Sequence, residues 1–130
     1  MVEVHLDTDV LIDLIERKPL NEIISLMERY DFKISAVVFF EFMVGVYRTG
    51  RTYLKPLILN YIEVLPITRE IADKSAEIEA ELMKRGEPID ARDLMIASTA
   101  IVREAMLWTN NLKHFQRLKS YGLKLFNSRV

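Results

Sequence analysis

The first fourteen residues change their hydrophobic period at one point, and this change constrains the fold more than any other feature. Val2, Val4 and Leu6 alternate with polar residues, which predicts a strand with one buried face. From Val10 onward, apolar residues recur at helical spacing. The turn between the two is Asp7-Thr8-Asp9, which places acidic side chains at the carboxyl end of a strand, where open α/β sheets bind ligands. An aspartate at this position is also a common N-terminal cap of a helix, and the turn alone does not separate the two roles.

The rest of the chain repeats the alternation of strand and helix. Further strands are predicted at 32–35, 61–65, 105–109 and 123–126, and further helices at 19–30, 36–47, 53–60, 68–85, 91–104 and 113–119. The intervals between strands are too long for hairpins and contain helices, which predicts an α/β fold with a parallel sheet covered by helices on both faces. No repeat or linker interrupts the chain, so residues 1–130 are expected to form one domain.

Composition narrows the classes of partner. The formal net charge is −1, with 18 Lys and Arg residues among 19 Asp and Glu residues, which argues against tight binding of long duplex DNA. A catalytic encounter with a phosphodiester stays compatible with this charge if a bound metal ion supplies positive charge. The absence of cysteine excludes a disulfide framework and a thiolate metal site, and it favours an intracellular, cytoplasmic location. No apolar run has the length of a membrane span and the N-terminus does not resemble a signal peptide, so no membrane association is expected.

Three carboxylates are candidates for a functional site. Asp7 ends the first strand, Glu41 is the one charged residue in the apolar segment 36–47, and Asp93 lies in the first turn of the helix 91–104. Each also has an ordinary explanation. Asp7 can cap a helix, Glu41 can form an ion pair with an arginine, and Asp93 can interact favourably with the helix dipole. The predicted topology nevertheless brings all three to the carboxyl edge of the sheet, where Asn111 also arrives after the fourth strand.

Three carboxylates that converge without a lysine or arginine repel one another. They stay ionised together when a hard cation such as Mg²⁺ or Mn²⁺ lies among them. A donor set of oxygens, without cysteine, favours those ions over a structural zinc ion. A cation of this kind suits hydrolysis of a phosphate ester, because it lowers the pKa of a bound water and neutralises charge in the transition state.

The sequence at this point resembles a PIN-domain ribonuclease, and more closely the toxin of VapBC-type toxin–antitoxin pairs. The resemblance covers the whole chain and rests on four segments in order: Leu6-Asp7-Thr8-Asp9-Val10-Leu11-Ile12, Ser35 to Gly45 with Glu41, Asp93-Leu94-Met95-Ile96-Ala97, and Trp108-Thr109-Asn110-Asn111 before Phe115. It implies a parallel sheet of order 3-2-1-4-5 and an endoribonuclease that depends on Mg²⁺ or Mn²⁺. It also implies a homodimer that is inhibited by a small antitoxin protein.

The resemblance also assigns roles to residues. It makes Asp7, Glu41 and Asp93 the catalytic acids that hold the metal ion. The family often has a fourth carboxylate in the turn that matches Asn110-Asn111 or just before the phenylalanine that matches Phe115, where this chain has Asn111 and His114. Asn111 is therefore the candidate for a neutral catalytic ligand, which leaves open whether one or two metal ions bind. His114 is either a proton shuttle or a solvated helix residue.

Two other functions compete with this interpretation. Asp7-Thr8-Asp9 also fits the motif of haloacid-dehalogenase-type phosphatases, but Leu11 replaces the small residue expected there and a downstream catalytic lysine is lacking. The other alternative is a PIN-like module that binds RNA or protein without catalysis, with a metal site weakened at Asn111.

The segment 36–47 has more apolar side chains than one buried helical face requires, including Phe39, Phe40, Phe42 and Tyr47. We expect part of it to be exposed, where it forms a two-fold contact, receives an antitoxin helix, or does both. The alternative is that the sheet and neighbouring helices bury all of it.

Overall fold

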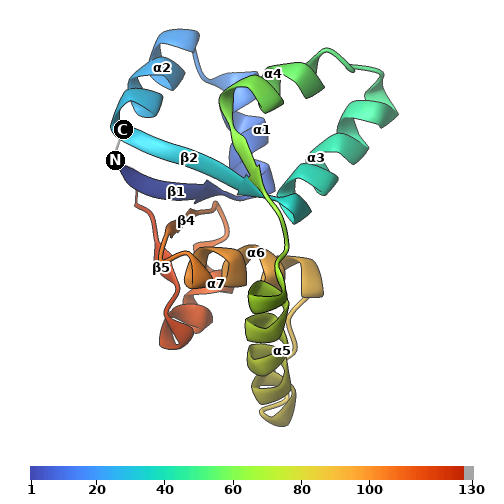
Figure 1. The fold of residues 1–130 in the computed structure, drawn as a ribbon, viewed down its shortest axis with the longest axis vertical. Coiled ribbons are helices and arrows are strands. Elements are labelled where there is room, and N and C mark those ends of the chain that lie inside the picture. The colour runs from blue at the N-terminus through green and yellow to red at the C-terminus, as the bar shows by residue number, and fades with distance from the viewer. Residues whose placement is uncertain (128–130) are drawn as a thin grey trace.

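The computed structural model describes residues 1–127, and these form a parallel sheet of five strands (Figure 1). The strands are β1 (Val2–Leu6), β2 (Tyr30–Ser35), β3 (Glu63–Leu65), β4 (Met106–Trp108) and β5 (Lys124–Leu125). Their order is β3-β2-β1-β4-β5, and every neighbouring pair is parallel, which confirms the predicted topology. Val4 fixes the register at the centre, because it is opposite Phe32 on one side and Met106 on the other.

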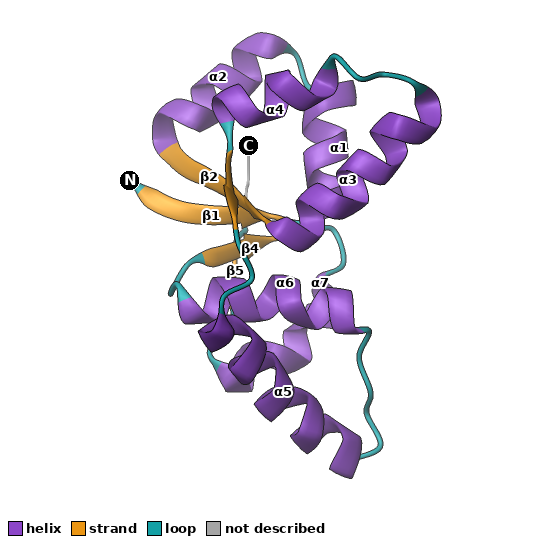
Figure 2. Cartoon of the chain, turned by 45° about the vertical axis from the view of Figure 1, so that its right-hand side comes forward, coloured by secondary structure: helices purple, strands orange, loops and turns teal. Residues whose placement is uncertain are grey.

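Helices cover both faces of the sheet, as expected for an α/β fold (Figures 1 and 2). The first group, above the sheet in Figure 1, comprises α1 (Thr8–Arg17), α2 (Leu20–Arg29), α3 (Ala36–Thr49) and α4 (Leu54–Tyr61). The second group, below it, comprises α5 (Arg69–Lys84), α6 (Ala91–Val102), α7 (Leu112–Phe115) and the 3₁₀ helix η1 (Gln116–Tyr121). Within residues 1–127, no helix combines the length and the apolar character needed to cross a membrane.

The long helix α5 shows how the sequence determines an element and its ends. The Thr68 hydroxyl accepts a hydrogen bond from the backbone N–H of Ile71, which satisfies a free donor of the first turn. Gly86 follows the helix with φ 68°, a left-handed conformation that glycine adopts without a steric cost. Helical spacing predicts that four residues share one face, and all four are buried: Ile71, Ser75, Ile78 and Leu82.

The prediction of one buried face for β1 is wrong. Val4 and Leu6 are buried as expected, but His5, on the opposite face, is only 1% exposed. The reason is that β1 lies in the middle of the sheet, between β2 and β4, with helices on both sides. The side chain of His5 is accommodated because its Nε2 lies 2.7 Å from Oε2 of Glu3.

The other differences concern the ends of elements. The strands β3, β4 and β5 are each two residues shorter than predicted, and α6 ends at Val102 rather than at residue 104. The predicted helix 113–119 is divided between α7 and η1. The face of α3 is partly exposed, as expected, because Phe40, Val44 and Tyr47 face solvent while Phe42 is buried.

Candidate active site

Asp7 lies at the junction of β1 and α1 and uses both carboxylate oxygens in hydrogen bonds. Oδ1 accepts from the backbone N–H of Thr8 at 2.9 Å, which makes Asp7 the N-cap of α1. Oδ2 accepts from the hydroxyl of Thr109, at the end of β4, at 2.8 Å. Burial raises the pKa of Asp7 above its ordinary value, the two hydrogen bonds oppose this shift, and the negative charge of Asp93 adds to it. Asp7 is therefore a helix cap and also part of a cluster of interacting acids.

Glu41 lies on α3 and points toward the same edge of the sheet. Its Oε1 accepts a 2.7 Å hydrogen bond from the hydroxyl of Thr8. Its Oε2 lies 3.8 Å from a guanidinium nitrogen of Arg92 on α6. The expectation that no lysine or arginine lies among the acids is therefore wrong. The contact is between α3 and α6, which sequence spacing along one helix does not reveal.

Asp93 follows Arg92 in the first turn of α6, and its Oδ2 lies 3.2 Å from Nε2 of His114. The two atoms are close but not aligned for a hydrogen bond, since Nε2 is buried without a hydrogen-bond partner. His114 is thus half-buried beside an acid of the cluster, and the interpretation of it as a solvated helix residue does not fit this position. Asp90, an aspartate directly before the helix, caps α6 by accepting from the backbone N–H of Arg92 at 2.9 Å.

Asn111 is exposed in the turn between β4 and α7, and its backbone N–H donates to the Thr109 hydroxyl at 3.0 Å. Its side chain does not cap α7. One hydroxyl therefore connects the turn that contains Asn111 to the carboxylate of Asp7. The sequence did not reveal the roles of Thr8 and Thr109. The available signal was a threonine within two residues of the end of a strand, at the edge of the sheet where ligands bind.

The remaining acids near the turn are peripheral. Asp9 is exposed, and Asp13 accepts a 3.0 Å hydrogen bond from the side chain of Asn110.

The donor set has the chemistry that a hard divalent cation requires. It consists of carboxylate oxygens on Asp7, Glu41 and Asp93, and the charges of Asp7 and Asp93 act on each other. In the arrangement of residues 1–127, however, no three Asp, Glu, His or Cys side chains form a complete metal-binding group. Glu41 is turned toward Thr8 and Arg92, and Asp93 toward His114. These residues fit an ion that keeps several of its waters, as Mg²⁺ usually does.

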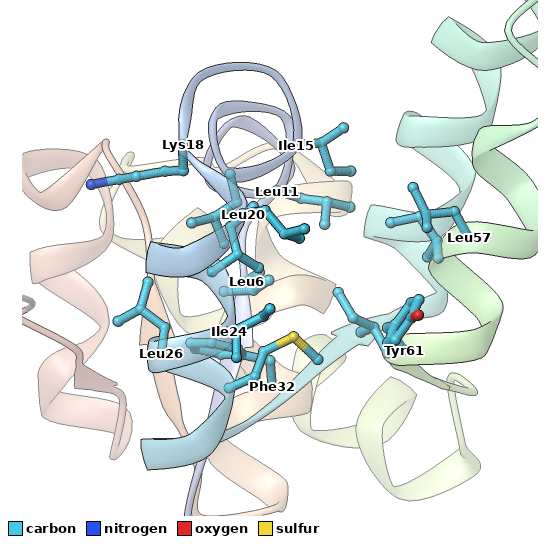
Figure 3. A pocket seen from close by; sticks show the side chains of 15 residues that line it. Leu6, Leu11, Ile15, Lys18, Leu20, Ile24, Leu26, Phe32, Leu57 and Tyr61 are labelled. Atoms are coloured by element: carbon cyan, nitrogen blue, oxygen red, sulfur yellow. The ribbon is translucent and has the colours of Figure 1, made fainter.

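A separate feature is an apolar groove of about 570 Å³ between α1, α2 and α4. Figure 3 shows Leu20 and Ile24 of α2 on one side and Leu57 and Tyr61 of α4 on the other. All four are exposed, so the core does not cover Leu20 and Ile24, although helical spacing places both on the apolar face of α2. None of the three acids lines this groove.

The sequence matches the model of the PIN domain over residues 4–120. The chain belongs to the PIN-domain family. One relative of this PIN domain is Ribonuclease VapC1 of Methanocaldococcus jannaschii, 35% identical over 96% of this chain and 88% of the relative. Another is the tRNA(fMet)-specific endonuclease VapC of Shigella flexneri, 29% identical over 91% of this chain and 93% of the relative. The family is thus that of the VapC ribonucleases, which generally depend on a divalent metal ion.

A solved structure supports the same assignment. The PIN domain superimposes with a TM-score of 0.82 and 27% identity on a chain of VapBC2 from Rickettsia felis, covering 98% of this chain and 99% of that one. That complex was crystallised with a DNA fragment from its promoter. The shared fold and the family support the nuclease over the phosphatase alternative.

Proposed function

We propose that this PIN domain is an endoribonuclease that hydrolyses RNA phosphodiester bonds with Mg²⁺ or Mn²⁺ and is the toxin of a toxin–antitoxin pair. The observation that supports the proposal is the placement of Asp7, Glu41 and Asp93 near one another, since the charge of Asp93 acts on Asp7 and Glu41 accepts a hydrogen bond from Thr8, the residue after Asp7. Two threonine hydroxyls hold two of these acids, which orients them without neutralising their charge. Membership of the VapC ribonuclease family supplies the reaction class.

The chain's own residues have distinct roles in this proposal. Asp7 and Asp93 are the acids that hold the cation, and Glu41 completes the set directly or through a water molecule. Asn111 contributes a neutral oxygen where a carboxylate would add charge, which weakens the site for a second ion. Thr8 and Thr109 are positioning residues, because each acts through the carboxylate to which it donates.

Hydrolysis at this site balances without any redox partner. The oxygen of a water molecule bonds to phosphorus, the ester bond to the leaving oxygen breaks, and a proton from the water is transferred to that oxygen. The cation, when bound, makes the water more acidic and offsets the negative charge on the phosphoryl oxygens. Asp7 and Asp93 would hold the cation, and both lie at the ends of elements rather than in the core.

The groove between α1, α2 and α4 is the proposed binding site for an antitoxin segment. Its lining is almost entirely apolar, and Leu20, Ile24, Leu57 and Tyr61 at its sides are exposed, which suits the apolar face of an amphipathic helix. Solved structures with the same fold include VapBC complexes from Rickettsia felis, Salmonella typhimurium and Haemophilus influenzae. We further propose a homodimer through the exposed face of α3 and a cytoplasmic location.

The test is cleavage of RNA by the purified chain, with tRNA(fMet), the substrate in the Shigella flexneri relative's name, as the first RNA. Asp93→Asn should abolish cleavage with Mg²⁺ while circular dichroism shows an unchanged fold. Asp73→Asn on the exposed side of α5 makes the same chemical change away from the acids and should cleave normally. Equal activity of the Asp93 variant and the wild type would contradict the proposed site. A folded wild-type protein that binds RNA without cleaving any would support a binding module instead.

A further inference from the structure

Arg92 has an unusual position beside the acids. Among residues 1–127, it is the one lysine or arginine whose side chain lies within 4 Å of any of the three carboxylates, at 3.8 Å from Glu41. The guanidinium therefore bridges from α6 to α3, where it lies beside Glu41. A cation at this place meets any anionic substrate that approaches the acids.

The guanidinium of Arg92 is held only loosely. Its distances to Glu41 and Asp90 are 3.8 Å and 3.5 Å, its side chain makes no hydrogen bond in the described part of the chain, and 58% of it is exposed. Ion pairs as exposed as this contribute little to stability. Arg103 is the contrasting case, since it donates hydrogen bonds of 2.7 Å and 2.9 Å to Glu3. Arg92 therefore has donors free for another partner, whereas Arg103 is a structural arginine.

A phosphodiester that approaches three carboxylates is repelled by them. An arginine at the rim offsets this repulsion, and its planar fork of donors matches two oxygens of one phosphate. We propose that Arg92 is a substrate-binding residue that contacts a backbone phosphate of the RNA next to the acids. This inference rests on the proposed ribonuclease function and adds to it the group that receives the phosphate.

The first test measures binding without catalysis. A fluorescein-labelled single-stranded RNA is titrated with the full chain in chelator, and anisotropy gives the Kd at several salt concentrations. Arg92→Ala should raise the Kd about tenfold, as expected for loss of hydrogen bonds to a charged group. It should also reduce the slope of log Kd against log salt by about 0.7, the value for one phosphate contact on a single strand.

Arg85→Ala is the matched control. Arg85 is 54% exposed and pairs with Glu81 at the end of α5, so its removal changes the net charge equally without touching the acids. It should leave Kd and slope unchanged. Equal effects of the two variants would overturn the proposal, because the loss of RNA binding would then follow from the change in net charge alone.

A double variant separates direct contact from an effect through Glu41. In a Glu41→Gln background, Arg92→Ala should still weaken RNA binding about tenfold if the guanidinium contacts the phosphate. If the effect disappears in that background, Arg92 acts only on Glu41 and the proposal is wrong. Because binding is measured in chelator, the outcome for Arg92 is independent of the cleavage test. Absence of cleavage by the wild type would contradict the proposed function, whereas equal binding by Arg92→Ala would contradict this inference alone.

Discussion

The hydroxyl of Thr109 donates a 2.8 Å hydrogen bond to Oδ2 of Asp7, across 102 residues of sequence. The same hydroxyl accepts from the backbone N–H of Asn111. Because Thr109 is buried, this one atom joins the end of β1, the end of β4 and the following turn. It thereby fixes the orientation of the Asp7 carboxylate relative to the turn that contains Asn111.

Replacing Thr109 should therefore impair the site more than the fold. Thr109→Val keeps the shape of the side chain but removes the donor to Asp7, and we expect activity to fall about tenfold to a hundredfold. The lost partner of the Asn111 N–H should lower the free energy of unfolding by about 1–3 kcal/mol. Thr109→Ser keeps the hydroxyl and should retain most of the activity. Cleavage kinetics and urea denaturation measure both effects, and a fully active Thr109→Val protein would show that the hydrogen bond is dispensable.

A charge added at Asn111 should strengthen metal binding. The Asn111 side chain is exposed and does not cap α7, so Asn111→Asp introduces a carboxylate without breaking a cap. A further charged ligand tightens a hard-cation site, and the Mg²⁺ concentration for half-maximal cleavage should fall. Asn110→Asp adds the same charge at a side chain that faces Asp13, and it should leave the metal dependence unchanged. If both variants behave alike, Asn111 does not act in the metal site.

The stability of the fold should depend on Glu3 in a defined pH range. Arg103 donates hydrogen bonds that lower the pKa of Glu3 from 4.5 to about 2, and His5 contributes in the same direction. A carboxylate with a depressed pKa stabilises the folded state above pH 4.5, and this contribution is lost as the pH falls toward 2. Glu3→Gln should thus be less stable than the wild type at pH 7 by a margin that narrows below pH 4.5. Urea midpoints at pH 7, 5, 4 and 3 measure the margin, which must stay constant if Glu3 is not responsible.

The exposed face of α3 predicts self-association. Phe40, Val44 and Tyr47 follow one another at helical spacing and are 57%, 50% and 61% exposed. The purified chain should sediment as a dimer at micromolar concentration, and Val44→Lys should convert it to a folded monomer. Phe42→Ser, at a buried position on the same helix, should instead unfold the protein. A wild type that is monomeric in this range would contradict the predicted interface.

Periodicity predicted most of the fold because the strongest patterns reflect burial. In α5, the spacing of Ile71, Ile78 and Leu82 and the cap at Thr68 are local signals, and all of them agree with the structure. The pattern did not show that β1 is central, since His5 is a polar residue that is buried through its pairing with Glu3. It placed Leu20 and Ile24 on the apolar face of α2 but did not show that this face is exposed, because the spacing is the same for a face covered by the core and for a face covered by a partner.

The sequence identified three acids as candidate site residues, but it did not identify the residues that contact them. Asp7, Glu41 and Asp93 stood out because acids at strand ends or in apolar helices are unusual. The contact of Arg92 with Glu41 joins α6 to α3, and the contact of Thr109 with Asp7 joins two strand ends. Contacts of this kind depend on how the elements pack, which no local pattern encodes.

Metal-dependent cleavage of RNA is the most direct test of the central claim that these acids act by holding a divalent cation. The purified chain is incubated with RNA in buffer, in buffer with EDTA, and in EDTA followed by excess Mg²⁺ or Mn²⁺. We expect cleavage to stop with EDTA and to return with either ion, because three carboxylates without a cation repel both one another and the phosphate. Full activity in EDTA, with Asp93→Asn inactive under the same conditions, would contradict the metal mechanism.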